Sequence, residues 1–380
     1  MRRLFASSLA LGALALGARP LAADDSVFGI RGLGILGRPH SAQSASAGGG
    51  FALFDPEGGS NPAALARWRG VSGWAVGSAS RRRFDSGTGE ATLTSTRFPL
   101  VGFATVVGQR LYVGVAISDY LDRTWSVSGV DTLTPRGSPV QVTDKSKSIG
   151  GVSDLRFAAA YRLSPALAVG AGVHALTGST RLEVTREFDD ATYQGFRDVA
   201  VTDFSGFGLS LGAVLTARPN LQVGGTLRIN SGLKAKSTSG ARATVALPVE
   251  LGFGAHYTPA PGLVLASSVG YAPWSRAADA LGAAGAARAR SVWSVGAGVD
   301  VEAIRLGSSR IPLRLGYRWR QLPFPVGGAA LGEHAFSGGF GLVLAGGRTT
   351  LDAGVEKGTR AAGAQSESFT TGFVGITVRP

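Results

Sequence analysis

The sequence predicts an all-β fold, namely a transmembrane antiparallel β-barrel of about 14 strands with an N-terminal plug, or hatch, in its lumen. From Gly70 to the C-terminus, segments in which apolar and polar residues alternate follow one another, and the connections between them are short and long in turn. After the N-terminal leader no apolar run reaches the 18 residues of a membrane helix. An alternating strand has one apolar and one polar face, so we expect it to lie between two different solvents.

The N-terminus has the pattern of a secretory signal peptide. Arg2 and Arg3 precede an apolar run, and small residues lead to a cleavage site after Ala23. Residues 1–23 are therefore the expected signal peptide, and an exported barrel is expected in the bacterial outer membrane. The chain has no cysteine, so burial and strand pairing must stabilise it without disulfides.

Fourteen segments of the remaining chain alternate. Most exceed the ~9–11 residues that a tilted strand needs to cross the hydrocarbon. An open edge in lipid leaves backbone groups unpaired, so the first and last strands should pair with each other. A soluble β-sandwich or propeller is the alternative, but it does not readily explain long strands with one lipid-like face. The expected strands are 71–84, 91–108, 110–129, 148–163, 166–186, 200–217, 220–236, 241–258, 262–275, 289–304, 310–321, 334–346, 348–359 and 367–379.

The connections fall into two groups. Tight turns such as Gly108-Gln109 and Ser164-Pro165 follow even-numbered strands. Long connections follow odd-numbered strands, although two further odd ones are short. Barrels place short turns in the periplasm and long loops outside the cell, which orients the chain. The expected long loops are 130–147, 187–199, 276–288 and 322–333.

The segment before the first strand does not alternate and is rich in Gly, Ala and Ser. It is too apolar for a free tail, and it ends where the barrel begins. We therefore predict that residues 24–69 form a plug inside the lumen and that residues 70–380 form the barrel.

Composition and motifs exclude several classes of function. The net charge is +13, but the arginines are scattered and no nucleic-acid-binding motif is present, so anionic outer-membrane lipids are the expected partners of this charge. The four histidines carry no catalytic or metal-binding motif. We predict no enzyme, no metal and no cofactor. Charged residues in strands 289–304 and 310–321 should pair across the lumen wall.

Several short motifs occur in an order that resembles the FadL-type outer-membrane transporters of long-chain fatty acids and other hydrophobic compounds. Gly32-Leu33-Gly34 is followed by Phe51-Ala52-Leu53-Phe54-Asp55 and then by Asn61-Pro62-Ala63 before the first strand. Leu247-Pro248-Val249-Glu250 is similar to a late-barrel segment of that family. The resemblance implies a 14-strand barrel with a hatch that carries Gly32, Gly34, Asp55, Asn61, Pro62 and Ala63.

Aromatic side chains are the candidate ligand-binding residues. Aromatics on outer loops can form an apolar landing surface, and those of the plug lie nearest a lumenal pocket. The six tryptophans and most tyrosines fall mostly near strand ends and are expected in the interface girdles. The candidate ligand-binding residues are Phe51, Phe54, Phe188, Tyr193, Phe196 and Phe324.

The resemblance implies passive uptake of a hydrophobic small molecule or lipid. Such a compound is captured by loops, passes a lumenal pocket, and leaves sideways through the wall after the hatch moves. Two alternatives remain open at this point. One is a barrel resembling PorV, a secretion accessory that binds an exported protein partner. The other is a structural barrel that transports nothing.

Overall fold

The computed structural model describes residues 27–30, 32–85, 90–277, 289–306, 309–326, 329–363 and 365–379. The expected signal peptide, residues 1–23, lies outside these ranges, as do residues 278–288 of one expected loop. In the described part of the chain, no helix has the length and apolarity needed to span a membrane.

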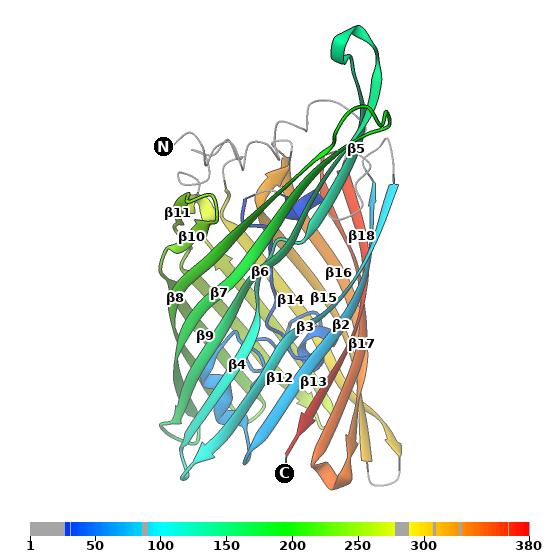
Figure 1. Cartoon of the computed structure of the whole chain (residues 1–380). Helices are drawn as coiled ribbons and strands as arrows, with labels where there is room; N and C mark the ends of the chain where they lie inside the picture. The colour runs from blue at the N-terminus through cyan, green and yellow to red at the C-terminus, as the bar shows by residue number, and fades with distance from the viewer. Residues whose placement is uncertain are drawn as a thin grey trace.

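The wall of the molecule is one antiparallel sheet that closes on itself (Figure 1). Strand β18 pairs with β2 along its length, so the last strand completes the sheet that the first began. The wall has fourteen strands, and three of them are interrupted, so that β4 continues into β5, β9 into β10 and β11 into β12. Both the fold class and the closing pair of strands agree with the sequence prediction.

The strand bounds are β2 (Ser72–Asp85), β3 (Glu90–Val107), β4 (Leu111–Asp122), β5 (Trp125–Leu133), β6 (Val140–Arg162), β7 (Leu167–Phe188), β8 (Phe196–Arg218), β9 (Leu221–Asn230), β10 (Leu233–Ser237), β11 (Arg242–Val245), β12 (Glu250–Ala260), β13 (Leu263–Ala272), β14 (Val292–Leu306), β15 (Ser309–Val326), β16 (Ala329–Leu344), β17 (Thr349–Ala362) and β18 (Gln365–Val378). Short 3-10 turns lie at η3 (Pro135–Gly137), η4 (Trp274–Ala277) and η5 (Ala345–Gly347). The bounds of most strands lie close to those expected from alternation.

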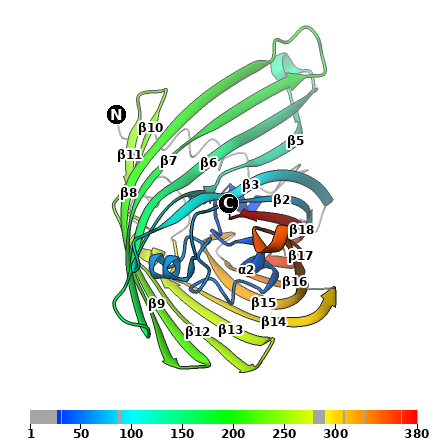
Figure 2. The ribbon, with the colours of Figure 1, turned by 90° about the horizontal axis from the view of Figure 1, so that it is seen from below.

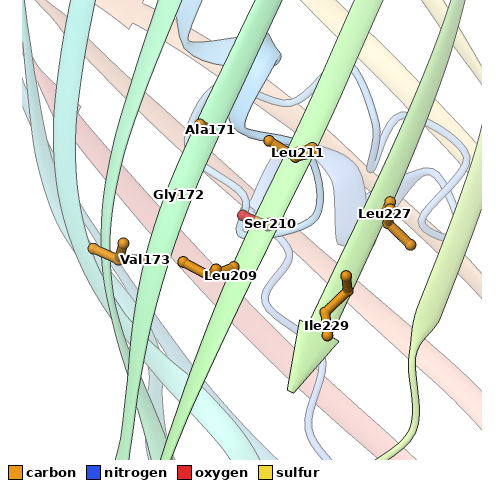
Figure 3. A pocket seen from close by; sticks show the side chains of 8 residues that line it. All are labelled: Ala171, Gly172, Val173, Leu209, Ser210, Leu211, Leu227 and Ile229. Atoms are coloured by element: carbon orange, nitrogen blue, oxygen red, sulfur yellow. The ribbon is translucent and has the colours of Figure 1, made fainter. Parts of the chain in front are cut away.

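The two faces of the wall differ as the alternation predicts. On β8, Leu209 and Leu211 are 49% and 56% exposed, whereas Ser210 between them is 4% exposed. Figure 3 shows these leucines pointing away from Ser210, on a shallow outer groove of β7, β8 and β9. The outer face is thus apolar and suited to lipid, and the inner face carries the polar and charged residues.

The segment before the barrel lies inside it, as the view along the barrel shows (Figure 2). Its elements are η1 (Val27–Gly29), β1 (Ile35–Leu36), α2 (Ala42–Ser46) and η2 (Pro62–Arg67). Ser41 caps α2 by accepting a hydrogen bond from the Ser44 backbone N–H. We call residues 27–68 the plug. The plug backbone approaches the wall closely where both sides carry small residues, as at Ala47 beside Gly298 and Gly316.

Two of the expected long loops are wrong. Residues 130–147 mostly belong to a hairpin of β5 and β6, which pair from Trp125–Ser148 to Leu133–Val140. Residues 322–333 lie largely in β15 and β16. Strand pairing continues beyond the apolar band, where the outer face no longer has to be apolar, so the alternation that marks a strand in lipid is no longer required. The β5–β6 hairpin projects above the rest of the barrel in Figure 1.

We predict that Gly316→Ala displaces the plug from its position against the wall. A Cβ on Gly316 in β15 would overlap the backbone of Ala47 and Gly48, and neither backbone can yield as a flexible side chain would. We expect a loss of about 1–3 kcal/mol in the free energy of unfolding and faster proteolytic cleavage within residues 27–68. The matched control is Gly372→Ala in β18, because a Cβ there meets nothing within 4 Å. Equal cleavage of the two variants would contradict the prediction.

Candidate functional site

The asparagine of the Asn61-Pro62-Ala63 motif forms hydrogen bonds both within the plug and to the wall. Its side-chain amide donates to the carbonyls of Leu53 (2.9 Å) and of Ala213 in β8 (3.3 Å). Its side-chain oxygen accepts from the Ala63 backbone N–H, which caps η2, and Pro62 is the first residue of that turn. Asn61 is therefore a buried junction between two parts of the plug and one wall strand.

Asp55 and Glu57 form an acidic corner of the plug. Asp55 accepts from the backbone N–H groups of Ser41 (3.1 Å) and Glu57 (3.0 Å), and burial raises the pKa of its carboxyl. Glu57 accepts from the hydroxyl of Thr377 in β18 at 2.6 Å. Burial, and then the negative charge of Asp55, raises the pKa of Glu57 to about 8. The plug is thus tied to the last strand by a carboxyl group that prefers to be protonated.

Gly32 and Gly34 hold the start of the plug close to the wall. Both have positive φ angles, +55° and +90°, which favour glycine. A Cβ on Gly32 would overlap the ring of Phe324, and one on Gly34 would overlap the backbone carbonyl of Asp122. All six residues of the expected hatch motif therefore lie in the plug or at its contacts with the wall; their role in movement stays a prediction.

The six candidate ligand-binding aromatics separate into two groups. Phe51 and Phe54 lie inside the barrel with ring centroids 5.8 and 5.5 Å from that of His256 in β12. Phe324, which we expected on an outer loop, is buried against Trp274 at 5.6 Å. The extended β15–β16 hairpin places it on the inner face of the wall.

The other three aromatics lie at the β7–β8 hairpin. The rings of Phe188 and Tyr193 are 5.5 Å apart, and the guanidinium of Arg186 lies over the exposed ring of Phe196. No contact in the described residues joins this group to the plug aromatics. Ligand binding by either group stays a prediction.

A buried ion-pair network connects the plug to β15, β16 and β17. Arg38 of the plug makes two hydrogen bonds to Glu356, at 2.7 and 2.8 Å. Glu333, which is fully buried, accepts from Arg318, Arg320 and Arg360. Arg320 also donates to the backbone carbonyl of Leu36 in the plug at 3.0 Å. These arginines neutralise the buried carboxylates and at the same time hold the plug in place.

The predicted pairing of opposite charges on neighbouring strands is confirmed by Arg314 and Asp300, whose atoms lie 2.7 Å apart between β15 and β14. In the part of the chain that the structure describes, no group of three or more metal-ligating side chains occurs.

The upper lumen contains a large apolar cluster that sequence reasoning missed. Because Tyr120, Trp274 and several other aromatics lie near strand ends, we expected them in interface girdles, but Trp274 is 1% exposed and lies inside. The alternation along a strand was the signal that could have shown which aromatics face inward. On β2, for example, Trp74 shares one face with Ser72 and Val76, and that face is directed inward. The cluster comprises Leu33, Tyr120, Leu121, Val152, Leu176, Phe204, Leu233, Ala235, Val245, Leu247, Ala272, Trp274, Ala277, Ala289, Val292 and Phe324.

A cavity of about 240 Å³ borders this cluster, and Tyr120, Trp274 and Val292 line it on the apolar side. Arg228, Glu250 and Arg320 line it on the polar side. A second cavity, of about 220 Å³, shares Arg228 and Glu250 with the first and continues along the plug.

The wall is discontinuous beside β4. Strand β3 pairs with β4 over Leu100–Val107, while β5 pairs with β6. In the described part of the chain no ladder joins residues 90–99 of β3 to β5, and we call the place between these two strands the wall break. At its base the plug strand β1 takes the place of β3, because Ile35 and Leu36 pair with Asp122 and Leu121 of β4. Arg97 of β3 reaches Asp122 at 2.6 Å across the break.

Comparisons with known proteins agree with this architecture. A family model described as BamG matches residues 32–248. The solved structure of the CymD monoaromatic hydrocarbon channel is similar, with a TM-score of 0.60, 16% identity, and coverage of 90% of this chain and 98% of that one. No curated protein sequence matches this chain.

Two further solved structures have the same fold. The toluene transporter TbuX of Ralstonia pickettii has a TM-score of 0.62 at 16% identity, with coverage of 90% of this chain and 98% of that one. A FadL homologue of Pseudomonas aeruginosa has a TM-score of 0.61 at 12% identity, with coverage of 91% and 99%. At these identities the likeness shows the fold, and the resemblance to FadL-type transporters is confirmed at that level.

Glu333→Gln should destabilise the barrel strongly. The substitution removes the charge that compensates three buried arginines, so we expect a loss of about 3–5 kcal/mol in the free energy of unfolding. Urea unfolding in detergent measures it. Glu187→Gln is the control, because its pair with Lys145 is half exposed and should contribute less than about 1 kcal/mol. Similar unfolding midpoints for the two variants would refute the proposed role of the network.

The seating of the plug should weaken as the pH rises. Glu57 prefers its protonated form in the seated plug, so its stabilisation is complete below the ordinary glutamate pKa of 4.5 and is lost as the pH rises through about 8. We expect proteolytic cleavage within residues 27–68 to be faster at pH 9 than at pH 6. Glu57→Gln should remove this difference, and Glu187→Gln should keep it. Cleavage of the unsubstituted chain that does not change with pH would show the prediction to be wrong.

Proposed function

Because this chain belongs to the BamG family and has the fold of channels for hydrophobic compounds, we propose that it is a bacterial outer-membrane channel for passive uptake of hydrophobic small molecules. The observation that carries the proposal is the apolar cluster in the upper lumen. A porin for polar solutes has a polar, water-filled interior. The apolar side chains of this cluster can instead pack against an apolar solute.

The two lumenal cavities lie along the proposed path. A compound that enters the apolar cluster next meets the 240 Å³ cavity beside Tyr120 and Trp274. This volume is below the ~300–1,000 Å³ of pockets for drug-sized ligands. It supports compact apolar compounds, or the end of a fatty-acid-like chain, as the substrate class.

The proposed exit is the wall break, with residues 24–69 acting as the hatch. Strand β1 covers the edge of β4 where β3 leaves it. Separation of β1 from β4 exposes this edge and frees space behind the break. A compound can then leave sideways into lipid without crossing the ion pairs that Arg38 of the plug and Arg318 of β15 make with Glu356.

A covalent bond between plug and wall tests the mechanism. Leu36 and Leu121 are cross-strand partners, and the natural chain has no cysteine, so Leu36→Cys with Leu121→Cys places a single disulfide there. In liposomes, we expect the oxidised double variant to lose uptake of a labelled fatty acid and of toluene. Reduction should restore the uptake of the unsubstituted chain.

The control is Thr359→Cys with Ser368→Cys, which are cross-strand partners of β17 and β18 on the outer face. Its uptake should not depend on the redox state. Uptake through the oxidised Leu36–Leu121 variant would refute hatch movement. Absence of uptake by the unsubstituted chain, together with co-purification of an exported protein, would favour the PorV-like alternative instead.

A further inference from the structure

Three inward-facing side chains on neighbouring strands form a linear hydrogen-bonded chain. His174 of β7 contacts both carboxylate oxygens of Asp154 of β6 through Nδ1, at 2.9 and 3.0 Å. The Nε2 atom of the same ring lies 2.9 Å from Oγ of Ser210 of β8. This is the order acid, imidazole and hydroxyl that activates a serine in hydrolases, and it is recognised by geometry on any fold.

Strand register and two glycines create the arrangement. His174 lies opposite Gly208, and Ser210 lies opposite Gly172, so histidine and serine are diagonal neighbours on the inner face. A Cβ on Gly172 would lie 2.7 Å from Oγ of Ser210, and one on Gly208 would lie 3.3 Å from Cβ of His174. The two glycines therefore leave the room that the imidazole needs to reach the hydroxyl.

Arg228 completes the cluster on the other side of the serine. It is the cross-strand partner of Ser210 on β9, and its Nη1 donates to Asp154 at 2.7 Å. This contact favours the ionised carboxylate, which accepts the Nδ1–H of His174 and leaves the Nε2 lone pair for the serine proton.

Two guanidinium nitrogens beside the cluster are buried without a hydrogen-bond partner within the described part of the chain. They are Nη2 of Arg228 and Nη1 of Arg156, the cross-strand partner of His174 on β6. Buried N–H groups without partners are rare in proteins. Arg228 is the cross-strand partner of Ser210 and lines the same cavity, so its Nη2 is a suitable donor to an oxyanion that develops beside the hydroxyl.

Ser210 is only 4% exposed, but it lines the second lumenal cavity. Ser210, Thr226 and Arg228 line the 220 Å³ cavity together with Leu53 of the plug and Leu251. The cavity thus offers a charged wall beside the hydroxyl and apolar side chains nearby. We propose that this cluster is a second functional site of the chain, a serine esterase site for short-chain aliphatic carboxylic esters.

The reaction balances with water as the only co-reactant. Oγ of Ser210 forms a bond to the ester carbonyl carbon while Nε2 of His174 takes its proton, and the carbonyl electron pair moves to oxygen beside Arg228. The bond to the alkoxy group breaks as His174 returns that proton to the leaving alcohol. Water then attacks the acyl-serine, His174 accepts its proton, and the carboxylic acid leaves as the proton returns to Oγ.

A fluorophosphonate probe tests the site directly on the full chain in detergent, without vesicles or flux, so its outcome is separate from the transport test. We expect intact-mass spectrometry to show one adduct, located on Ser210 by peptide mapping. The unsubstituted chain should also hydrolyse p-nitrophenyl butyrate. A chain that forms no adduct and releases no p-nitrophenol would overturn the proposal.

Variants separate catalysis from structure. Ser210→Ala should abolish the adduct, and His174→Gln should lower hydrolysis by at least about 100-fold. Ser237→Ala is the control, because Ser237 is another buried wall serine and hydrogen-bonds to Ser239 instead. The heat-dependent gel shift of the folded barrel should be the same in all variants. Hydrolysis that persists at the original rate in folded Ser210→Ala would show that the cluster is only structural.

Discussion

Hydrocarbon offers no hydrogen-bond partner to a backbone N–H or C=O, and the structure follows from this constraint. Each unpaired group in lipid costs several kcal/mol, so the sheet must close, and the pairing of β18 with β2 closes it. Closure creates an inside and an outside along every strand. The outward residues within the hydrocarbon then have to be apolar, and buried charged side chains of the wall such as Arg314 and Glu333 are directed into the lumen.

A lumen filled with charged side chains must satisfy them, and here the plug takes part. Glu333 and Glu356 are buried among arginines of neighbouring strands, and Arg38 of the plug completes the set. The plug is therefore held mainly by groups that the wall itself requires to be paired. Glycines such as Gly48 and Gly316 allow the two backbones to touch, which adds close packing to these ionic contacts.

The lumen contains both apolar clusters and ion pairs, and the plug contacts both kinds of surface. Its strand β1 substitutes for β3 beside β4. This short pairing covers the edge of β4 that β3 leaves open. The Asp154–His174–Ser210 cluster is buried in the neighbouring wall strands, where Asp154 lines the first cavity and Ser210 lines the second.

Local pattern alone determined the strands, their number and the presence of an enclosed N-terminal segment, because side-chain alternation has a period of two residues and needs no distant contact. The place of Asn61 in the plug could also be predicted from its motif, and the ion pair of Arg314 could be predicted from opposite charges on adjacent strands. Only the tertiary structure decided that Trp274 and Phe324 face inward, since both lie near strand ends where the apolar band no longer constrains the pattern. The contacts among Asp154, His174 and Ser210 also could not be predicted from the sequence. They depend on the register of β7 against its neighbours, which strand pairing fixes and no local motif indicates.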